Sequence, residues 1–120
     1  DGVIELPSGL QYRVLVEGPA GGPSPGPSTR CACHYRGTTI DGKEFDSSYK
    51  RGQPTEFAPN QVIAGWTEAL QLMPEGSKWE LYIPAELGYG AGGQGPIGPN
   101  AVLIFEVELL QADVSKSKEG

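Results

Sequence analysis

Residues 89–110, YGAGGQGPIGPNAVLIFEVELL, pass directly from a loop composition into a strand pattern. The first twelve residues begin with Tyr89 and are then so rich in glycine and proline that they are poorly suited to pair in a sheet. From residue 103 an apolar side chain occupies every second position, which is the period of a strand with one buried face. The stretch therefore predicts a core strand over 103–109, preceded by a flexible loop that carries a tyrosine.

The same alternation recurs in three earlier segments, residues 10–16, 31–40 and 78–83. Asp41-Gly42 follows the second of these segments. This dipeptide between strand-like runs is a strong signal for a tight hairpin turn, whose two central residues prefer positive φ. We therefore expect residues 43–46 to return as an antiparallel strand.

One segment has the period of a helix. Within residues 62–73, apolar side chains at positions 63, 66, 70 and 73 follow each other at spacings of three and four, and Pro74 ends the run. Several strands and one short helix predict an α+β fold, in which an antiparallel sheet of about five strands wraps around the helix.

A chain of 120 residues has the size of one ordinary domain. We expect residues 10–112 to form that domain, residues 1–9 to be an N-terminal extension without a firm pattern, and the polar residues 113–120 to be a disordered tail. The stretch 18–28 contains five glycines and prolines in its first six residues alone and is expected to be a loop. Too little chain precedes this loop for it to link two domains.

The charge of the chain limits its partners. The formal net charge is −6, and the lysines and arginines form no cluster. Binding through nucleic-acid phosphates or anionic lipids needs concentrated positive charge. No apolar run approaches the roughly 20 residues that a membrane-spanning helix needs. We therefore expect a soluble chain that binds neither nucleic acid nor membrane.

Cys31, Cys33 and His34 are the combination that suggests a metal. A structural zinc site takes four protein ligands, and the chain contains no further cysteine or histidine. Cysteines two apart on a strand share a face but are poorly placed to bridge each other, so we expect buried thiols. His34 should face away from Tyr35. We predict no metal and no cofactor, and keep a metal-responsive protein as an alternative.

Aromatic side chains are candidates for an apolar pocket. Tyr89 lies in a loop that cannot be core, and Trp66 follows Gly65 at the start of the predicted helix, so a pocket is favoured over an ordinary core. Asp46 follows Phe45 at a strand end, where it either caps the backbone of the two following serines or joins the pocket. The full aromatic set consists of Tyr35, Phe45, Phe57, Trp66, Tyr89 and Phe105.

Five motifs occur in one order along the chain. Together they resemble the FK506-binding-protein (FKBP) type of peptidyl-prolyl cis-trans isomerase, from about Leu10 to Leu110. Three further segments, 7–12, 65–73 and 96–100, are similar to the macrophage infectivity potentiator (Mip) branch of that family. The motifs are His34-Tyr35-x-Gly37, Asp41-Gly42-x-x-Phe45-Asp46-Ser47-Ser48, Val62-Ile63-x-Gly65-Trp66, Tyr89-Gly90 and Phe105-x-Val107-Glu108-Leu109.

This resemblance implies a set of site residues. The Ile63 backbone N–H and the Tyr89 hydroxyl are expected to donate to carbonyl oxygens of a ligand, and Gln94 and Ile97 are expected to make contacts from the loop. The catalytic residues implied are Asp46, Trp66, Tyr89 and Phe105, and the substrate-binding residues are Tyr35, Phe45, Phe57, Val62, Ile63 and Ile97.

The resemblance also implies an activity. It predicts an enzyme that accelerates rotation about X-Pro bonds of polypeptide clients without covalent chemistry, and that binds the macrolides tacrolimus and rapamycin. The alternative is a module that binds proline segments, or a chaperone, without significant turnover. The Mip branch dimerises through a helical segment that this sequence does not contain, so we expect a monomer. The branch also favours the secretory pathway, the extracellular space or the periplasm over the cytoplasm.

Overall fold

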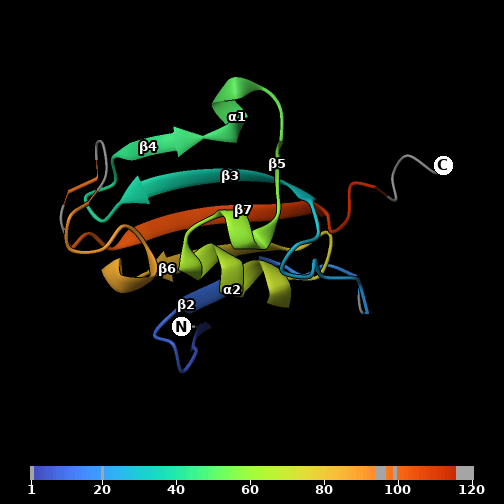
Figure 1. Ribbon diagram of the computed structural model, residues 1–120, viewed down its shortest axis with the longest axis horizontal. Helices are drawn as coiled ribbons and strands as arrows, with labels where there is room; N and C mark the ends of the chain where they lie inside the picture. The colour runs from blue at the N-terminus through green and yellow to red at the C-terminus, as the bar shows by residue number, and fades with distance from the viewer. Residues whose placement is uncertain (1, 20, 94–96, 99, 116–120) are drawn as a thin grey trace.

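The computed structural model describes residues 2–19, 21–93, 97–98 and 100–115 (Figure 1). Within these residues one antiparallel sheet has the strand order β1-β2-β6-β7-β3-β4, and β5 pairs with β3 outside this path. The sequence predicted about five strands, and the two additional ones are short. The strands are β1 (Val3–Glu5), β2 (Gln11–Val16), β3 (Cys31–Thr39), β4 (Glu44–Ser47), β5 (Thr55–Phe57), β6 (Lys78–Ile83) and β7 (Leu103–Gln111).

The helix α2 (Ala64–Leu72) crosses one face of this sheet (Figure 1). It begins two residues later than predicted because the backbone at Val62 and Ile63 is extended, with ψ of 178° and 155°. It ends at Leu72, shortly before Pro74, which cannot continue a helix. The α+β prediction is therefore confirmed. Three shorter helical segments are α1 (Ser48–Arg51) and the 3₁₀ turns η1 (Pro59–Gln61) and η2 (Ala85–Leu87).

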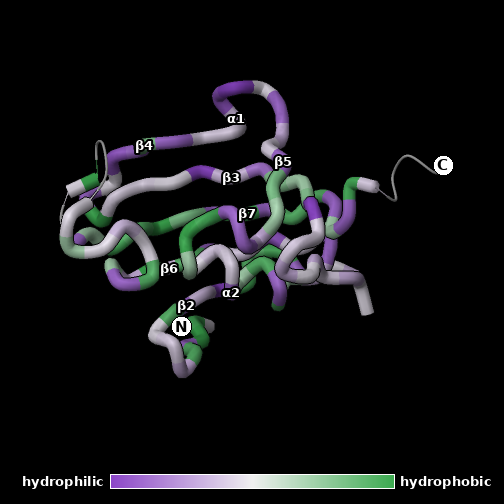
Figure 2. The backbone as a smooth tube through the Cα atoms, viewed as in Figure 1, coloured by the Kyte–Doolittle hydropathy of each residue, from purple (hydrophilic) through white to green (hydrophobic). Residues whose placement is uncertain are grey.

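The core lies between α2 and the sheet. The central strands β6 and β7 bury every second residue, as their alternation predicted. Figure 2 shows the contrast between the mostly hydrophilic segment around α1 and the hydrophobic stretches nearer α2. The buried cluster includes Leu10, Cys31, Cys33, Trp66, Leu70, Met73, Trp79, Leu81, Ile83, Leu103, Phe105, Val107 and Leu109.

The hairpin between β3 and β4 differs from the prediction in its turn. The Thr39 N–H donates to the Lys43 carbonyl at 2.9 Å, so the loop has three residues, and only Gly42 has positive φ, at 88°. The β3–β4 register also shifts between Gly37 and Thr38. A three-residue loop with a bulge is the common alternative to the two-residue turn that the sequence predicted.

The first two strands also depart from the expected pattern. β1 lies within residues 1–9, where we expected no regular structure, and pairs with β2. In β2 the alternation predicted that Val14 and Val16 are buried, but Val14 is 37% exposed and Val16 is 50% exposed. A register shift between these two residues interrupts the pairing with β6. This end of β2 therefore contributes little to the core.

Hydrogen bonds attach the loop over residues 18–28 and the segment after β7 to the rest of the domain. In the proline-rich stretch 18–28, Ser24 Oγ donates to the Met73 carbonyl at 2.6 Å, and the Asn60 N–H donates to the Pro27 carbonyl at 3.0 Å. Val114 is buried and its N–H donates to Arg30, so the packed chain extends past residue 113, where we expected the tail to begin. Residues 116–120 of that tail lie outside the described residues.

The cysteines and the histidine take the predicted sides of β3. Cys31 and Cys33 are fully buried free thiols in the core. His34 lies on the other side, where its ring stacks on Tyr49 at 4.6 Å and its Nδ1 is 2.8 Å from Ser48 Oγ. Across the described residues, no group of three or more His, Cys, Asp or Glu could hold a metal ion. In the same part of the chain, no helix has the length and apolarity to cross a membrane.

Replacement of Gly65 by alanine tests the packing of α2 on the sheet. A Cβ at this position would lie 2.9 Å from Ile83 Cγ2. Glycine to alanine inside a helix normally stabilises by about 0.5–1 kcal/mol. Here we expect a destabilisation of about 1–3 kcal/mol, because the added methyl group overfills the core. Urea unfolding measures it, with Gly92→Ala, which meets open space, as the neutral control. A more stable Gly65→Ala variant would contradict this packing.

Candidate active site

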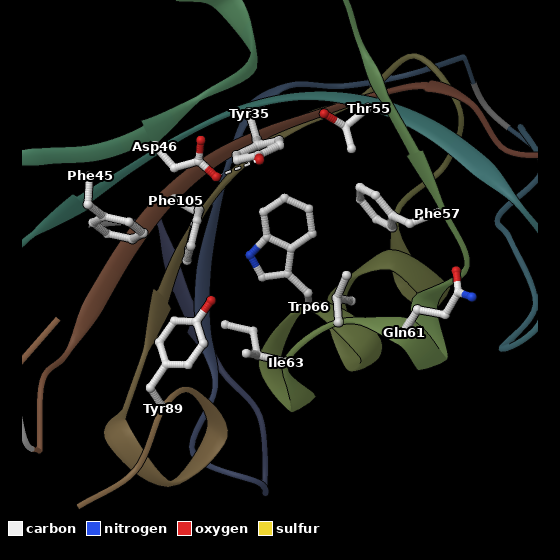
Figure 3. A pocket seen from close by; sticks show the side chains of 11 residues that line it. Tyr35, Phe45, Asp46, Thr55, Phe57, Gln61, Ile63, Trp66, Tyr89 and Phe105 are labelled. Carbon is white, nitrogen blue, oxygen red and sulfur yellow. Dashed lines mark hydrogen bonds between the residues drawn. The ribbon is translucent and has the colours of Figure 1, made fainter. Parts of the chain in front are cut away.

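An open cavity of about 420 Å³ lies beside the first turn of α2 (Figure 3). β3, β4, β5, β7 and the loops before α2 and after β6 supply its other walls. Every site residue predicted from the sequence lines it except Ile97 and Gln94, of which Gln94 lies outside the described residues. The lining residues are Tyr35, Phe45, Asp46, Thr55, Phe57, Gln61, Val62, Ile63, Trp66, Tyr89 and Phe105.

Trp66 forms the floor of the cavity. It is the third residue of α2 and is only 4% exposed. Its ring meets Tyr35 and Phe105 nearly edge-on, with centroids 5.0 Å and 5.1 Å away, and Phe57 at 5.4 Å. Such edge-to-face contacts are favoured by the charge distribution of aromatic rings. The floor is therefore a rigid set of interlocked rings.

The indole nitrogen of Trp66 is buried without a hydrogen-bond partner among the described residues. In Figure 3 this nitrogen is turned toward the Phe105 ring. The two rings are nearly perpendicular, at 88°, so an edge of one ring meets the face of the other.

Asp46 forms the polar edge. Its Oδ2 accepts from the Tyr35 hydroxyl at 2.6 Å, and its Oδ1 accepts from Arg51 at 2.7 Å and from the Ser47 N–H at 2.9 Å. Both roles considered for Asp46 therefore occur together, since it caps a backbone N–H and lines the cavity. Arg51 also donates to the Tyr35 hydroxyl and to Thr55 Oγ1, at 2.9 Å and 3.0 Å.

These contacts fix the charges at the edge. Burial acts to raise the pKa of Asp46, but the hydrogen bonds from Tyr35 and Arg51 and the charge of Arg51 outweigh it and lower that pKa. Burial, together with the hydrogen bond to Asp46, raises the pKa of Tyr35. At neutral pH the cavity edge therefore carries an ionised carboxylate and a neutral phenol.

The sequence analysis assigned no site role to two of the lining residues. Thr55 belongs to a three-residue strand, which is too short to show a period. Gln61 ends η1, and its Oε1 accepts from the Ala58 N–H at 2.9 Å. A glutamine three residues after the N-cap of a helix is a known sequence signal for this kind of cap, and Gln61 stands three residues after Ala58, the N-cap of η1.

Ile97 is not among the lining residues that the structure describes. It is 5% exposed and packs in the same buried cluster as Trp66 and Phe105, so its place in the cavity wall stays a prediction. The other expected loop contact, Gln94, lies outside the described residues.

The lining residues limit the chemistry of the cavity. Among those that the structure describes there is no histidine, cysteine, lysine or serine. The lining also contains Asp46 and Thr55, but the Asp46 carboxylate accepts hydrogen bonds through both oxygens and the Thr55 hydroxyl accepts one from Arg51, so neither has a free base beside it to activate it. The arrangement is instead suited to enclosing an apolar group, removing it from water and placing it near a fixed negative charge.

Comparison with known proteins identifies the arrangement. The family described as FKBP-type peptidyl-prolyl cis-trans isomerase matches residues 22–110. The chain is 53% identical over 110 residues to the outer membrane protein MIP of Legionella longbeachae, covering 91% of this chain and 46% of that protein. It is 54% identical over 112 residues to the FKBP-type 22 kDa peptidyl-prolyl cis-trans isomerase of Escherichia coli, covering 92% of this chain and 53% of that protein.

Solved structures agree with these matches. FkpA from Escherichia coli superposes with a TM-score of 0.87 at 46% identity, covering 93% of this chain and 53% of that one. AtFKBP13 superposes with a TM-score of 0.84 at 36% identity, covering 90% of this chain and 96% of that one. The chain spans about half the length of the curated relatives that it matches. By motif, fold and cavity, the chain belongs to the FKBP-type peptidyl-prolyl cis-trans isomerase family.

Proposed function

We propose that this domain accelerates cis-trans isomerisation of X-Pro peptide bonds in polypeptide clients. The observation that carries the proposal is the cavity floor of interlocked rings around Trp66, with the fixed carboxylate of Asp46 at its edge. A proline ring is a compact apolar group of the kind that such a floor encloses. The proposal needs no cofactor.

The mechanism follows from the electronic structure of the amide. Resonance in the planar peptide bond gives a rotation barrier of about 18–20 kcal/mol and places partial negative charge on the carbonyl oxygen. In the twisted state that resonance is lost and the charge falls. A cavity that excludes water therefore disfavours the planar amide more than the twisted one, and each 1.36 kcal/mol of this difference gives a tenfold increase in rate.

We assign roles to nine of the eleven lining residues. Trp66 seats the proline ring, and Tyr89 donates its hydroxyl to a carbonyl oxygen of the client. The charge of Asp46 biases the local field, and the Ile63 N–H donates to a second carbonyl oxygen. Phe105 closes the floor beside Trp66, while Tyr35, Phe45, Phe57 and Val62 form walls.

The proposal also includes ligands of the cavity, the bounds of the domain, its oligomeric state and its cellular location. The size and aromatic lining of the cavity support binding of the macrolides tacrolimus and rapamycin. We place the isomerase domain at residues 10–112, with β1 in the extension before it and the packed residue Val114 directly after it, and we expect this chain alone to be a monomer. A relative bears the name outer membrane protein, which supports a secreted or periplasmic setting.

The experiment that tests the function measures isomerisation of a short X-Pro peptide by a protease-coupled assay, with and without tacrolimus. We expect acceleration that tacrolimus abolishes. Tacrolimus binding without acceleration would replace the enzyme with a module that binds proline segments. Absence of both effects would overturn the proposal.

Tyr89→Phe tests the proposed hydroxyl donor. Within the described residues no hydrogen bond holds this hydroxyl, so its removal should leave the fold intact. We expect kcat/KM to fall about tenfold, which corresponds to one hydrogen bond that the client loses. Tyr82→Phe is the matched control, because it removes a hydroxyl that bonds to Glu80 on the outer face of the sheet. Equal effects of the two variants would remove Tyr89 from the mechanism.

The pH dependence tests the charge of Asp46. Its pKa lies below the ordinary value of 3.8, so we expect kcat/KM to stay constant from about pH 8 to about pH 5 and to fall only in stronger acid. The same lowered pKa stabilises the fold above pH 3.8, and this contribution is lost as the pH falls through the folded-state value.

NMR exchange spectroscopy of a proline peptide measures this profile without a protease. Asp46→Asn should lower kcat/KM about tenfold at neutral pH and should weaken the acid dependence of unfolding. A variant with the activity of the natural protein would show that the charge at this edge is irrelevant to the rate.

A further inference from the structure

The cavity wall between Phe57 and Trp66 is a short arc, residues 58–63, that ends at the start of α2. Its last three residues, Gln61, Val62 and Ile63, line the cavity. Ile63 is the N-cap residue of α2. Within the described residues no acceptor takes up the Ile63 backbone N–H, as is usual for the first N–H groups of a helix. The direction of this N–H therefore depends on what holds the arc in place.

The side chain of Thr67, about one turn into α2, contacts carbonyl oxygens of the arc. Its Oγ1 lies 2.6 Å from the Pro59 carbonyl oxygen, and 3.3 Å and 3.2 Å from those of Val62 and Ile63. A hydroxyl has one proton to donate, and the shortest contact identifies Pro59 as its main acceptor. Pro59 is fully buried, so its carbonyl finds little water to replace this bond.

Two further bonds limit how the arc can move. Gln61 and Ala58 are joined twice, since the Gln61 N–H donates to the Ala58 carbonyl and the Ala58 N–H donates to Gln61 Oε1, both at 2.9 Å. The Asn60 N–H donates to Pro27 at 3.0 Å. The turn is thus internally rigid and fastened at its outer side. Thr67 is the side chain that links this rigid turn to α2.

We propose that Thr67 is a positioning residue, whose hydroxyl bond to the Pro59 carbonyl sets the direction in which Ile63 presents its N–H to the bound polypeptide. The proposal rests on the function proposed above. Thr67 itself is absent from the cavity lining and acts through the backbone of the arc.

The position of Ile63 determines which kinetic constant should change. In the proposed function the Ile63 N–H donates to a second carbonyl oxygen of the client. We take this carbonyl to lie outside the rotating X-Pro bond, so its hydrogen bond is equally strong in the planar and the twisted state. An interaction of this kind contributes to KM and not to kcat. A purely structural role of Thr67 would instead lower the fraction of folded enzyme, and therefore kcat, at unchanged KM.

The test compares three variants. Thr67→Val keeps the shape but removes the donor, Thr67→Ser keeps the donor, and Thr38→Val removes a hydroxyl that contacts the Ile104 carbonyl at 3.5 Å, outside the cavity lining. KM and kcat are measured well below the melting temperature, together with the Kd for tacrolimus and the amide NMR signal of Ile63 in the free protein. Thr67→Ala replaces the valine variant if that variant does not fold.

We expect Thr67→Val to raise KM and the tacrolimus Kd about tenfold at unchanged kcat, and Thr67→Ser and Thr38→Val to stay within about twofold of the natural protein. Unchanged KM and Kd, or a loss in kcat alone, would overturn the proposal.

If the natural protein neither accelerates isomerisation nor binds tacrolimus, the proposed function fails, and the Ile63 amide signal decides the positioning role separately. A signal that shifts in Thr67→Val and not in Thr38→Val supports the role, and an unshifted signal overturns it.

Discussion

The absence of a side chain at Gly37 sets the position of the aromatic wall on which the cavity depends. Gly37 lies opposite Phe105 in the pairing of β3 with β7. A Cβ at this position would lie 2.6 Å from Phe105 Cε1 and 2.7 Å from Phe45 Cζ. Because that space is free, both rings lie over the backbone of β3. The centroid of the Phe105 ring is then 5.1 Å from the centroid of the Trp66 ring. Two paired strands, rather than loops alone, therefore shape the cavity floor.

The edge of the cavity depends on charge instead of close packing. Arg51 is the last residue of α1 and joins Asp46 of β4, Tyr35 of β3 and Thr55 of β5 through its guanidinium group. The side chains of Arg51 and Asp46 are 46% and 40% exposed, so this ion pair fixes the geometry of the edge more than it stabilises the fold. An amide that loses charge from its oxygen on twisting would experience a dry floor and a constant field together.

The central part of the fold could be predicted because its strands each bury one complete face. β6 occupies residues 78–83 as predicted, and β7 begins at the predicted Leu103. At Val14 and Val16 the same alternation failed to predict burial, since both side chains are exposed and a register shift between them interrupts the pairing with β6. β1 and β5 have three residues each and form by pairing with longer neighbours, so no local period could reveal them.

The residues of the site also fall into two groups, those that the sequence could predict and those that it could not. The rings could be predicted because Tyr89 occurs in a loop that cannot be core and Trp66 starts a helix. The residues that support them have partners that only the folded chain brings close, as with Asn60 and Pro27. Two neighbouring residues of α2 illustrate this difference. Trp66 faces the cavity and belongs to a motif, whereas Thr67 bonds to the buried Pro59 carbonyl, a contact that no pattern in the sequence specifies.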